Sequence, residues 1–475
     1  MQVRNPRTGE FDYEIAPLDQ VAIADEVSRL RSAQLEWGAK TPQQRADIML
    51  LFADAIEGAA AGALIPALTT DTGRSGISKM EVFGAAGHIR RWANMAPEMI
   101  ANAQRQGEPT SHPTISTSTR LSPYPLVGVI SPWNFPMTLA LIDAVPALLA
   151  GSAVLIKPSE VTPRFIRPLM EAVGTVPDLA AVLSIIEGDG PTGAAMIDQV
   201  DFVCFTGSVT TGRKVGEAAA RAFIPASLEL GGKDPLIVLA SADMEQAAAT
   251  ALRGSIVNTG QACQSIERVY VASEIAESFL EKLVSLAQEA RLNHPDINKG
   301  DIGPFIFARQ AEIAQSQIDD AVSQGAKVLA GGKVETLDGG LYLRPTVLTN
   351  VREQMAIIAE ENFGPVIPVQ TFNSIDEAIA LANSGEFGLS AAVIAATAEE
   401  AESVAARLNV GAVSINDASL TSMVWEAEKS SFGYSGIGPS RMGDSGLMRF
   451  FRKKALIRQS GPAARISDFS EEKLS

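Results

Sequence analysis

Cysteine and histidine are scarce in this sequence, with two cysteines and three histidines among 475 residues. Cys204 and Cys263 are too few for a disulfide framework, and this scarcity predicts a reducing, cytoplasmic setting. Zinc sites draw mainly on Cys and His side chains, and the chain has no CxxC motif. The histidines stand far apart in the sequence, at His88, His112 and His294. We therefore expect no metal site.

Positive charge is also in short supply. The chain carries 39 Lys and Arg against 55 Asp and Glu, a formal net charge of −16 at pH 7, and has no basic cluster. Nucleic acids and anionic membranes attract basic surfaces, so we expect neither as a partner. The N-terminal stretch "MQVRNPRTGEFDYE" has no apolar signal core, which also favours a cytoplasmic protein.

One apolar run, residues 135–156, approaches the length of a membrane span. Asp143, Pro146 and Gly151 interrupt it, and it divides into a helix-like first part and a β-branched second part. We interpret the run as a buried helix followed by a strand in the core of a globular protein.

The length of the chain suggests roughly two to four domains. From residue 126 onward, short apolar runs alternate with helix-like stretches, which predicts an α/β fold with parallel strands covered by helices on both faces. After "LELGGKDP" the same alternation resumes and predicts a second α/β domain. The runs that we expect to be strands are "LVGVIS", "AVLIKPSE", "DFVCFTGS", "ERVYVA", "AKVLAGG", "PVIPVQTF", "SAAVIAA" and "GAVSIND".

Two segments do not follow this alternation. Residues 109–125, "PTSHPTISTSTRLSPYP", are rich in Ser, Thr and Pro, and form either a linker or an extended hairpin that packs on a partner subunit. Residues 460–475, "SGPAARISDFSEEKLS", are polar enough to be disordered.

Three stretches carry signals for a nucleotide. "GDGPTG" at 188–193 matches G-x-G-x-x-G, but only about nine residues separate it from the next strand, too few for a full dinucleotide-binding unit. "FTGSVTTG" at 205–212 is better placed, because Gly207 and Ser208 precede a helix start whose free N–H groups can hold a pyrophosphate. Lys157 and Glu160 follow a strand, where they can grip ribose hydroxyls, although a solvated loop pair is equally consistent with them.

Cys263 lies in "NTGQACQSIER", at a turn that leads into a strand, where a thiol can face a cleft. A thiolate can add to a carbonyl carbon if a base and an oxyanion site assist it. Glu229 in "LELGGK" follows an apolar run and is a candidate base, and the Asn134 amide in "SPWNFP" can donate to an oxyanion. We predict that Cys204, in the middle of an apolar strand, is buried and inert.

Six motifs in this order, "SPWNFP", "IKPSE", "FTGSVTTG", "LELGGK", "GQAC" and "ENFGPV", resemble the aldehyde dehydrogenase superfamily, from "NPRTGE" to about residue 460. The resemblance implies a Rossmann-like NAD-binding domain at 1–105 and 125–231 and a catalytic domain at 232–440. It also implies a small β oligomerisation element at 106–124 and 441–462, followed by a polar tail at 463–475. Homodimers or homotetramers are the assembly that it implies.

The resemblance also implies a non-acylating, NAD-dependent enzyme, with NADP possible, that oxidises an aldehyde through a thiohemiacetal and a thioester. Cys263 would be the nucleophile, Glu229 the general base, and Asn134 with the Cys263 backbone N–H the oxyanion hole. The implied cofactor contacts are Ser131, Trp133, Lys157, Ser159, Glu160, Gly190, Phe205, Gly207, Ser208, Leu230, Gly231, Glu361 and Phe363. Because Glu160 should repel a 2′-phosphate, we predict NAD rather than NADP.

The sequence departs from the family pattern at 431–443, "SFGYSGIGPSRMG", which is short and lacks an Arg-Glu pair. The expected channel residues are largely apolar and predict an uncharged hydrophobic or aromatic aldehyde: Met137, Leu139, Val257, Ala262 and Trp425. The alternatives are a semialdehyde dehydrogenase, an acylating enzyme, a thiol hydrolase and a non-catalytic protein. An acylating enzyme would lack Glu229, a hydrolase needs a His base, and a non-catalytic protein would have lost Cys263 or Glu229.

Overall fold

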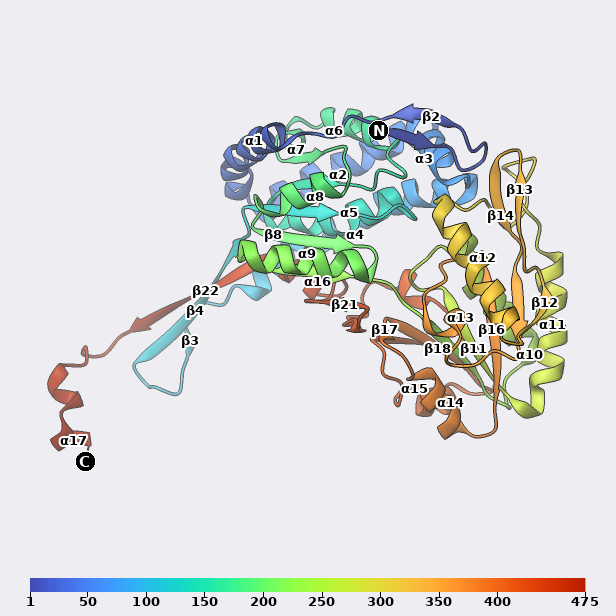
Figure 1. Ribbon diagram of the computed structural model, residues 1–475. Coiled ribbons are helices and arrows are strands. Elements are labelled where there is room, and N and C mark those ends of the chain that lie inside the picture. Colours follow the sequence, from blue (N-terminus) through green and yellow to red (C-terminus); the bar gives the residue numbers. More distant parts are fainter. Residues whose placement is uncertain (475) are drawn as a thin grey trace.

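The computed structural model describes residues 1–474 and has two sheet-centred lobes with an arm that projects from one of them (Figure 1). The first lobe contains a six-stranded sheet in the order β21-β9-β8-β5-β6-β7. Its strands are β5 (Leu126–Ile130), β6 (Ala153–Lys157), β7 (Leu183–Ile185), β8 (Phe202–Thr206), β9 (Ala226–Glu229) and β21 (Gly436–Ile437). All neighbours are parallel except β21, which is antiparallel to β9.

The second lobe contains a seven-stranded sheet in the order β12-β15-β16-β11-β10-β18-β19. Only its edge strand β12 is antiparallel to its neighbour. Its strands are β10 (Asp234–Val238), β11 (Ile266–Ala272), β12 (Lys327–Ala330), β15 (Thr346–Thr349), β16 (Val366–Phe372), β18 (Ser390–Ile394) and β19 (Ala412–Ile415). The predicted α/β fold with two parallel-sheet domains is therefore confirmed.

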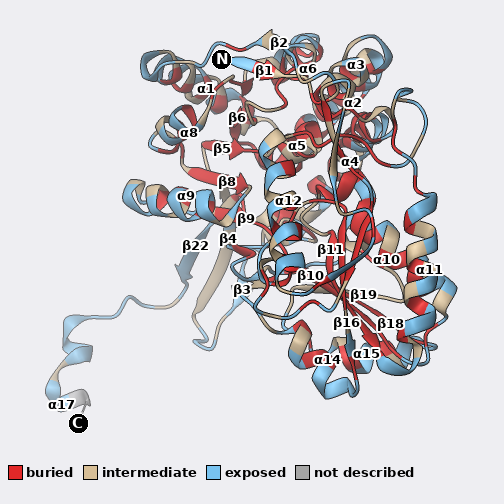
Figure 2. Cartoon of the chain, turned by 45° about the vertical axis from the view of Figure 1, so that its right-hand side comes forward, coloured by how far each residue is buried: buried red, intermediate tan, exposed pale blue. Residues whose placement is uncertain are grey.

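Helices cover both faces of the seven-stranded sheet, and Figure 2 shows its strands as a buried layer between them. One face of the sheet packs against α10 (Met244–Ile256) and α11 (Ala276–Glu289). The other face packs against α14 (Ile375–Ala382) and α15 (Ala398–Ala405). A sheet that is buried on both faces needs apolar side chains in both directions, which explains continuous apolar strands such as "PLIVL".

The apolar run at 135–156 forms α5 (Pro136–Ala150) and β6, in agreement with our interpretation. Pro136 starts the helix, where its missing N–H costs nothing, and Gly151 ends it with a φ of 105°. Nearly all of α5 and all of β6 are buried in the core of the first lobe. Helices that build the same lobe are α6 (Ile166–Gly174), α7 (Pro177–Ala180), α8 (Gly190–Ile197) and α9 (Val209–Ala222).

The N-terminal part of the chain adds a helical layer to the first lobe. It consists of α1 (Gln20–Ala39), α2 (Pro42–Ala59), the π-helix η1 (Ala60–Leu64), α3 (Ile65–Thr72) and α4 (Ser75–Ala103). Among the described residues, the run Pro42–Thr72 is the one long enough and apolar enough for a membrane span by length and composition. In the structure, α2 packs against α4 and buries Met49, Phe52 and Ile56 in the core.

The arm is a three-stranded sheet of β3 (Glu108–Pro109), β4 (Ile115–Pro123) and β22 (Phe451–Gln459), all antiparallel. Of the two interpretations of 109–125, the structure therefore shows the hairpin. Figure 2 shows β22 exposed to solvent along its length. Whether the arm joins subunits stays a prediction. The chain returns to the first lobe at β21, a few residues before residue 440, where we predicted that the catalytic domain ends.

Short elements complete the described chain. The tail that we expected to be disordered extends beyond the arm and includes two helical turns, η5 (Ile466–Phe469) and α17 (Glu471–Leu474). The remaining elements are β1 (Gln2–Arg4), β2 (Phe11–Glu14), η2 (Val257–Gly260), η3 (Ser273–Ile275), α12 (Ala308–Ser323), β13 (Val334–Leu337), β14 (Gly340–Leu343), α13 (Ala356–Ala359), β17 (Phe387–Gly388), η4 (Leu420–Ser422), β20 (Phe432–Gly433) and α16 (Ser445–Met448).

Candidate active site

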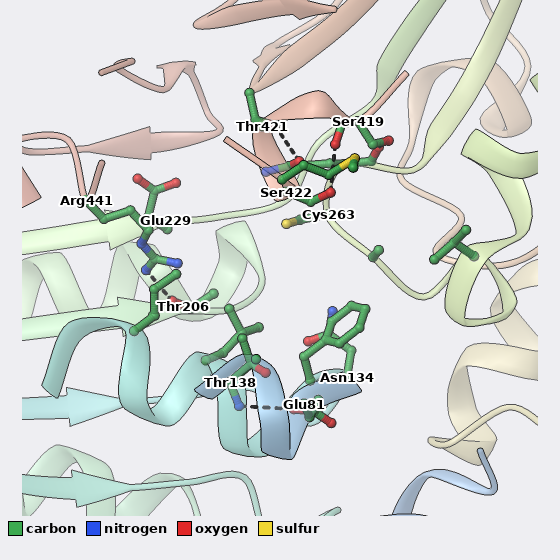
Figure 3. A pocket seen from close by; sticks show the side chains of 18 of the residues that line it. Glu81, Asn134, Thr138, Thr206, Glu229, Cys263, Ser419, Thr421, Ser422 and Arg441 are labelled. Atoms are coloured by element: carbon green, nitrogen blue, oxygen red, sulfur yellow. Dashed lines mark hydrogen bonds between the residues drawn. The ribbon is translucent and has the colours of Figure 1, made fainter. Parts of the chain in front are cut away.

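A cavity of about 440 Å³ contains the three residues that the sequence proposes for catalysis, Cys263, Glu229 and Asn134. Its walls come from α4, the start of α5, the ends of β8 and β9, the turn before β11 and the segment after β19 (Figure 3). The cavity therefore lies between the two lobes, at the carboxyl ends of parallel strands, where α/β folds commonly bind ligands.

The turn that presents Cys263 has an unusual backbone. Asn258, Thr259 and Gly260 all have positive φ angles, of 54°, 61° and 71°. The Asn258 side chain holds the turn by donating to the Asn134 carbonyl oxygen at 2.9 Å. A Cβ atom on Gly260 would lie 2.2 Å from the Gly364 carbonyl oxygen, so only glycine fits there. This close approach sets the 361–364 loop directly against the turn of Cys263.

The Cys263 thiol is only partly exposed to the cavity. Burial raises its pKa to about 12, and the carboxylates of Asp234 and Glu229 act in the same direction. The positive charges of Lys429 and Arg441 act in the opposite direction. The nucleophilic thiolate is therefore a minor species at neutral pH in this state, so the chemistry needs a base or additional positive charge.

Asn134 lies in the loop between β5 and α5 and is buried. Its amide nitrogen donates to the Gln261 carbonyl oxygen at 2.9 Å, which fixes the amide beside the Cys263 turn and leaves its second hydrogen for another acceptor. Glu81 of α4 stabilises the start of α5, because its carboxylate accepts a hydrogen bond from the Thr138 N–H at 3.0 Å. Burial raises the pKa of Glu81 to about 7.

Glu229 is the last residue of β9 and reaches the cavity from the strand end. Its carboxylate accepts a bond from the Ser431 hydroxyl at 3.1 Å. Thr206, its register partner on β8, accepts a bond from the Arg441 guanidinium at 2.6 Å (Figure 3). A carboxylate with one weak partner is free to reorient, as a base that serves a water molecule must be.

The residues predicted for the nucleotide gather at the carboxyl ends of β5, β6 and β8. The Lys157 ammonium donates to the Gly188 carbonyl oxygen at 3.1 Å and lies 3.8 Å from the Glu160 carboxylate. Ser208 caps α9, whose N-terminal N–H groups lie beside it. The Ser131 hydroxyl is buried without a partner in the structure, as a group that awaits a ligand would be.

A second group of predicted cofactor contacts lies nearer to Cys263. Trp133 and Phe363 make an edge-to-face contact with ring centroids 5.4 Å apart. Glu361 accepts a bond from the Gly232 N–H at 3.0 Å, and burial raises its pKa. Glu267 of β11 holds this loop by accepting from the N–H groups of residues 362 and 363 at 2.8 and 2.9 Å. The two groups together fit an extended dinucleotide that leads to Cys263.

Further predicted cofactor contacts are Ser159, Phe205, Leu230, Gly231 and Gly190. Ser159 accepts a bond from the Val161 N–H, Phe205 is buried in β8, and Leu230 lines the cavity. Gly231 leaves room for the Glu361 carboxylate, which a Cβ atom would approach to 2.7 Å. Gly190 opens α8, a helix of eight residues, so "GDGPTG" forms a short turn and helix start as the spacing predicted.

Several predictions from the sequence need correction or addition. Met137, expected in the channel, is fully buried and does not line the cavity, whereas Leu139, Val257, Ala262 and Trp425 do. Four charged residues around the site were not predicted: Glu81, Glu267, Lys429 and Arg441. Only Arg441 had a signal, since it lies in the stretch that departs from the family pattern. No group of metal-ligating side chains occurs within residues 1–474.

The comparisons with known proteins agree with this geometry. The model of the aldehyde dehydrogenase family matches residues 1–456. The crystal structure of the "putative aldehyde dehydrogenase PutA" from Anabaena variabilis superposes with a TM-score of 0.95 and 50% identity, covering 98% of each chain. Betaine aldehyde dehydrogenase from Staphylococcus aureus, solved with NAD+, gives a TM-score of 0.91 at 29% identity, covering 98% of this chain and 92% of that one.

A curated relative gives a further match. The "putative succinate-semialdehyde dehydrogenase (NADP+) 2" of Mycobacterium tuberculosis is 34% identical over 432 residues, which are 90% of this chain and 82% of that protein. The family match spans nearly the whole chain, and the structural matches reproduce both lobes. The chain belongs to the aldehyde dehydrogenase family and is an oxidoreductase that acts on aldehydes.

Proposed function

We propose that this protein oxidises an uncharged, hydrophobic or aromatic aldehyde to a carboxylic acid with NAD. The single observation that carries the proposal is the convergence of Cys263, Glu229 and Asn134 on one cavity beside the nucleotide contacts. The Cys263 thiol loses its proton to solvent water and the thiolate sulfur adds to the aldehyde carbon. The resulting oxyanion accepts bonds from the Asn134 amide and the Cys263 backbone N–H. Bound NAD supplies the hydride acceptor.

Glu229 acts in the second half of the reaction. The thioester on Cys263 is attacked by a water molecule whose proton passes to the Glu229 carboxylate. The carbon–sulfur bond then breaks, the sulfur regains its electron pair and the carboxylic acid leaves. A thiol suits both halves, because its thiolate is a good nucleophile and also a good leaving group from the thioester.

The lining of the cavity supports an apolar substrate. Leu139, Ile142, Val257 and Trp425 contribute apolar side chains to its walls. Three of the apolar side chains that line the cavity, those of Met80, Val257 and Met423, are also exposed to solvent. An apolar substrate would gain free energy by removing this surface from water.

A semialdehyde is the second candidate, because a relative bears that name and two arginines and a lysine line the cavity. Each arginine already has a carboxylate partner. Arg253 pairs with Asp417, and Arg441 pairs with Asp143 at 3.2 Å. Lys429 lies close enough to Asp234 to lower the pKa of that carboxyl, which burial raises to about 7. Because an aspartate engages each arginine and the rest of the lining is mainly apolar, the apolar aldehyde remains the preferred substrate.

The first experiment follows the absorbance of reduced nicotinamide when the purified protein meets NAD and benzaldehyde. We expect turnover that disappears in Cys263→Ala. Succinic semialdehyde and a straight-chain apolar aldehyde complete the panel. A larger kcat/KM for succinic semialdehyde than for both apolar substrates would reverse the substrate assignment and leave the reaction type intact.

The preference for NAD rests on Glu160. Its carboxylate is partly exposed and lies beside Lys157, where the ribose hydroxyls of a nucleotide would lie. A 2′-phosphate at that position would face a negative charge. We expect Glu160→Gln to raise kcat/KM with NADP about tenfold relative to NAD. A wild-type protein that already prefers NADP would contradict this assignment.

We also propose that the arm joins subunits into a homodimer or homotetramer in the cytoplasm. A three-stranded sheet with little core of its own is marginal in isolation, and β22 exposes both of its faces. Deleting residues 451–475 should convert the assembly to monomers in sedimentation velocity experiments. A wild-type protein that sediments as a monomer would refute the proposal.

A further inference from the structure

The stretch 431–443, where the sequence departs from the family pattern, forms one side of the environment of Glu229. Gly436 of β21 is the register partner of Glu229 in the sheet. Ser431, at the start of the stretch, donates its hydroxyl hydrogen to the Glu229 carboxylate. Arg441, near its end, lines the same cavity. A single segment therefore supplies the strand neighbour of Glu229, its hydrogen-bond donor and a nearby cation.

The Arg441 guanidinium lies one strand away from Glu229, because it donates to Thr206, the register partner of Glu229 on β8. Figure 3 shows Arg441 and Glu229 at the same end of the cavity. Burial disfavours the charge of Arg441, but the carboxylates of Asp143 and Glu229 outweigh this, so its pKa lies above the ordinary value. The two charges therefore interact across the cavity wall.

Asp143 anchors Arg441 from the core side. This carboxylate is fully buried on α5 and pairs with two arginines, Arg441 at 3.2 Å and Arg449 at 2.5 Å. Two cations share one anion, so the cluster has an excess positive charge that faces Glu229. In addition, the Nε–H group of Arg441 is buried without any partner. An unpaired donor on a buried cation is costly unless an acceptor approaches it during function.

We propose that Arg441 is a positioning residue that keeps the Glu229 carboxylate turned toward Cys263 while the thioester is hydrolysed. The inference rests on the role proposed above for Glu229. In that step a water oxygen bonds to the acyl carbon, its proton passes to Glu229, and the carbon–sulfur bond breaks with its electrons returning to Cys263. A buried cation attracts a nearby carboxylate and so restricts the directions in which the Glu229 side chain can point.

Other charged or hydrogen-bonding groups lie near Glu229 and near the cluster of Asp143, Arg441 and Arg449. Lys429 faces Cys263 from the segment after β19, and Ser431 bonds Glu229 directly. The remaining titratable or charged groups that face the cluster are His88, Cys204, Asp234, Cys263 and Arg449. Arg441 differs from these groups in combining a positive charge, an unpaired buried donor and a hydrogen bond to Thr206, the register partner of Glu229.

The test uses an activated ester, p-nitrophenyl acetate, and needs no cofactor. The ester acylates the Cys263 thiol and releases p-nitrophenolate in a burst, after which hydrolysis of the acetyl-enzyme sets the steady rate. In Arg441→Met we expect a burst rate within about threefold of the wild type and a steady rate lower by at least about tenfold. Acetylated Cys263 should accumulate in the intact-mass spectrum, and added hydroxylamine should restore turnover.

Two further readouts separate positioning from general damage. Arg441→Lys, which keeps the positive charge, should restore most of the hydrolysis rate that Arg441→Met loses. Arg164→Lys is the matched control, because Arg164 is also buried against an aspartate, Asp71, but outside the cavity, and its rates should not change.

The possible outcomes differ clearly. A parallel loss of burst and steady rate in Arg441→Met would overturn the proposal, as would an unchanged steady rate. A variant that hydrolyses the ester normally but has a raised KM for succinic semialdehyde alone would show that Arg441 binds a substrate carboxylate instead. A wild type that neither acylates nor oxidises any aldehyde would refute the proposed function itself, not only this inference.

Discussion

The two cysteines of this chain occupy contrasting regions of the molecule. Cys204 lies in the middle of β8, fully buried, with parallel strands on both sides. Cys263 lies in a left-handed turn before β11 and opens into a cavity. Burial raises the thiol pKa in both places, so the pKa does not distinguish them.

The two cysteines differ in their access to the cavity and in the groups that surround them. Around Cys263 the chain places an amide donor, a carboxylate and two cations, whereas Cys204 is surrounded by strand neighbours and core side chains. A regular strand hides alternate side chains on both faces of a sheet that helices cover, while a turn at the strand end can aim a side chain into a cleft. Reactivity in this fold therefore follows from backbone geometry more than from residue type.

The largest expected effect comes from removing the cavity thiol. Cys263→Ala should lower aldehyde oxidation by roughly a thousandfold or more, since Cys263 supplies the thiol that lines the cavity. Cys204→Ala should keep kcat/KM within about twofold of the wild type. Steady-state kinetics with NAD measures both variants. A substantial residual rate in Cys263→Ala, with circular dichroism unchanged, would mean that the reaction does not pass through this sulfur.

The second test distorts the turn that precedes Cys263 but keeps the Cys263 thiol. Gly260→Ala places a Cβ atom 2.2 Å from a backbone oxygen at a φ of 71°, and we expect it to cost about 2 to 4 kcal/mol of stability together with most of the activity. Urea denaturation measures the cost. Gly325→Ala is the matched control, since Gly325 also has a positive φ, of 101°, but an added Cβ there has no neighbour within 4 Å. Equal stabilities would show that the turn relaxes easily.

The third test compares the reactivity of the two thiols with iodoacetamide. Without cofactor, a pKa of about 12 leaves Cys263 largely protonated, so its alkylation rate should rise about tenfold per pH unit from pH 7 to 10. A free thiol such as N-acetylcysteine levels off near its lower pKa. Cys204 should not react in the folded protein. Peptide mapping after timed quenching gives each rate, and a plateau for Cys263 below pH 9 would contradict the expected burial effect.

The contrast between the cysteines was visible in the sequence. Glycine and asparagine beside Cys263 signalled a turn, and the unbroken apolar run around Cys204 signalled a buried strand. The alternation of strands and helices likewise predicted both sheets, and the strand ends located Lys157, Ser208 and Glu229. These inferences succeed because they depend on local periodicity and on the rule that parallel strands end at one edge.

The sequence did not predict contacts between distant segments. Glu267, which holds the 361–364 loop, lies almost a hundred positions before it, and Arg441 reaches Asp143 across most of the chain. Met137 was misplaced because helical phase decides which side chains of α5 face the cavity, and motif position does not reveal that phase. Charge partners and helix rotation are set by tertiary packing, which no short pattern encodes.

The smallest expected effect concerns the buried cysteine alone. Cys204→Ala removes one sulfur atom from a fully packed strand and should cost about 1 to 2 kcal/mol, through lost contacts and a small cavity. The thermal midpoint at pH 7 should fall by a few degrees, since the thiol is protonated there in both the folded and the unfolded protein. Burial raises the pKa of this thiol in the folded protein, so above about pH 8.5 the unfolded thiol ionises first and the wild type loses stability with rising pH. Cys204→Ala should lack this component. Denaturation at pH 7 and pH 10 measures the difference, and an identical pH dependence for both proteins would show that Cys204 ionises in the folded state as well.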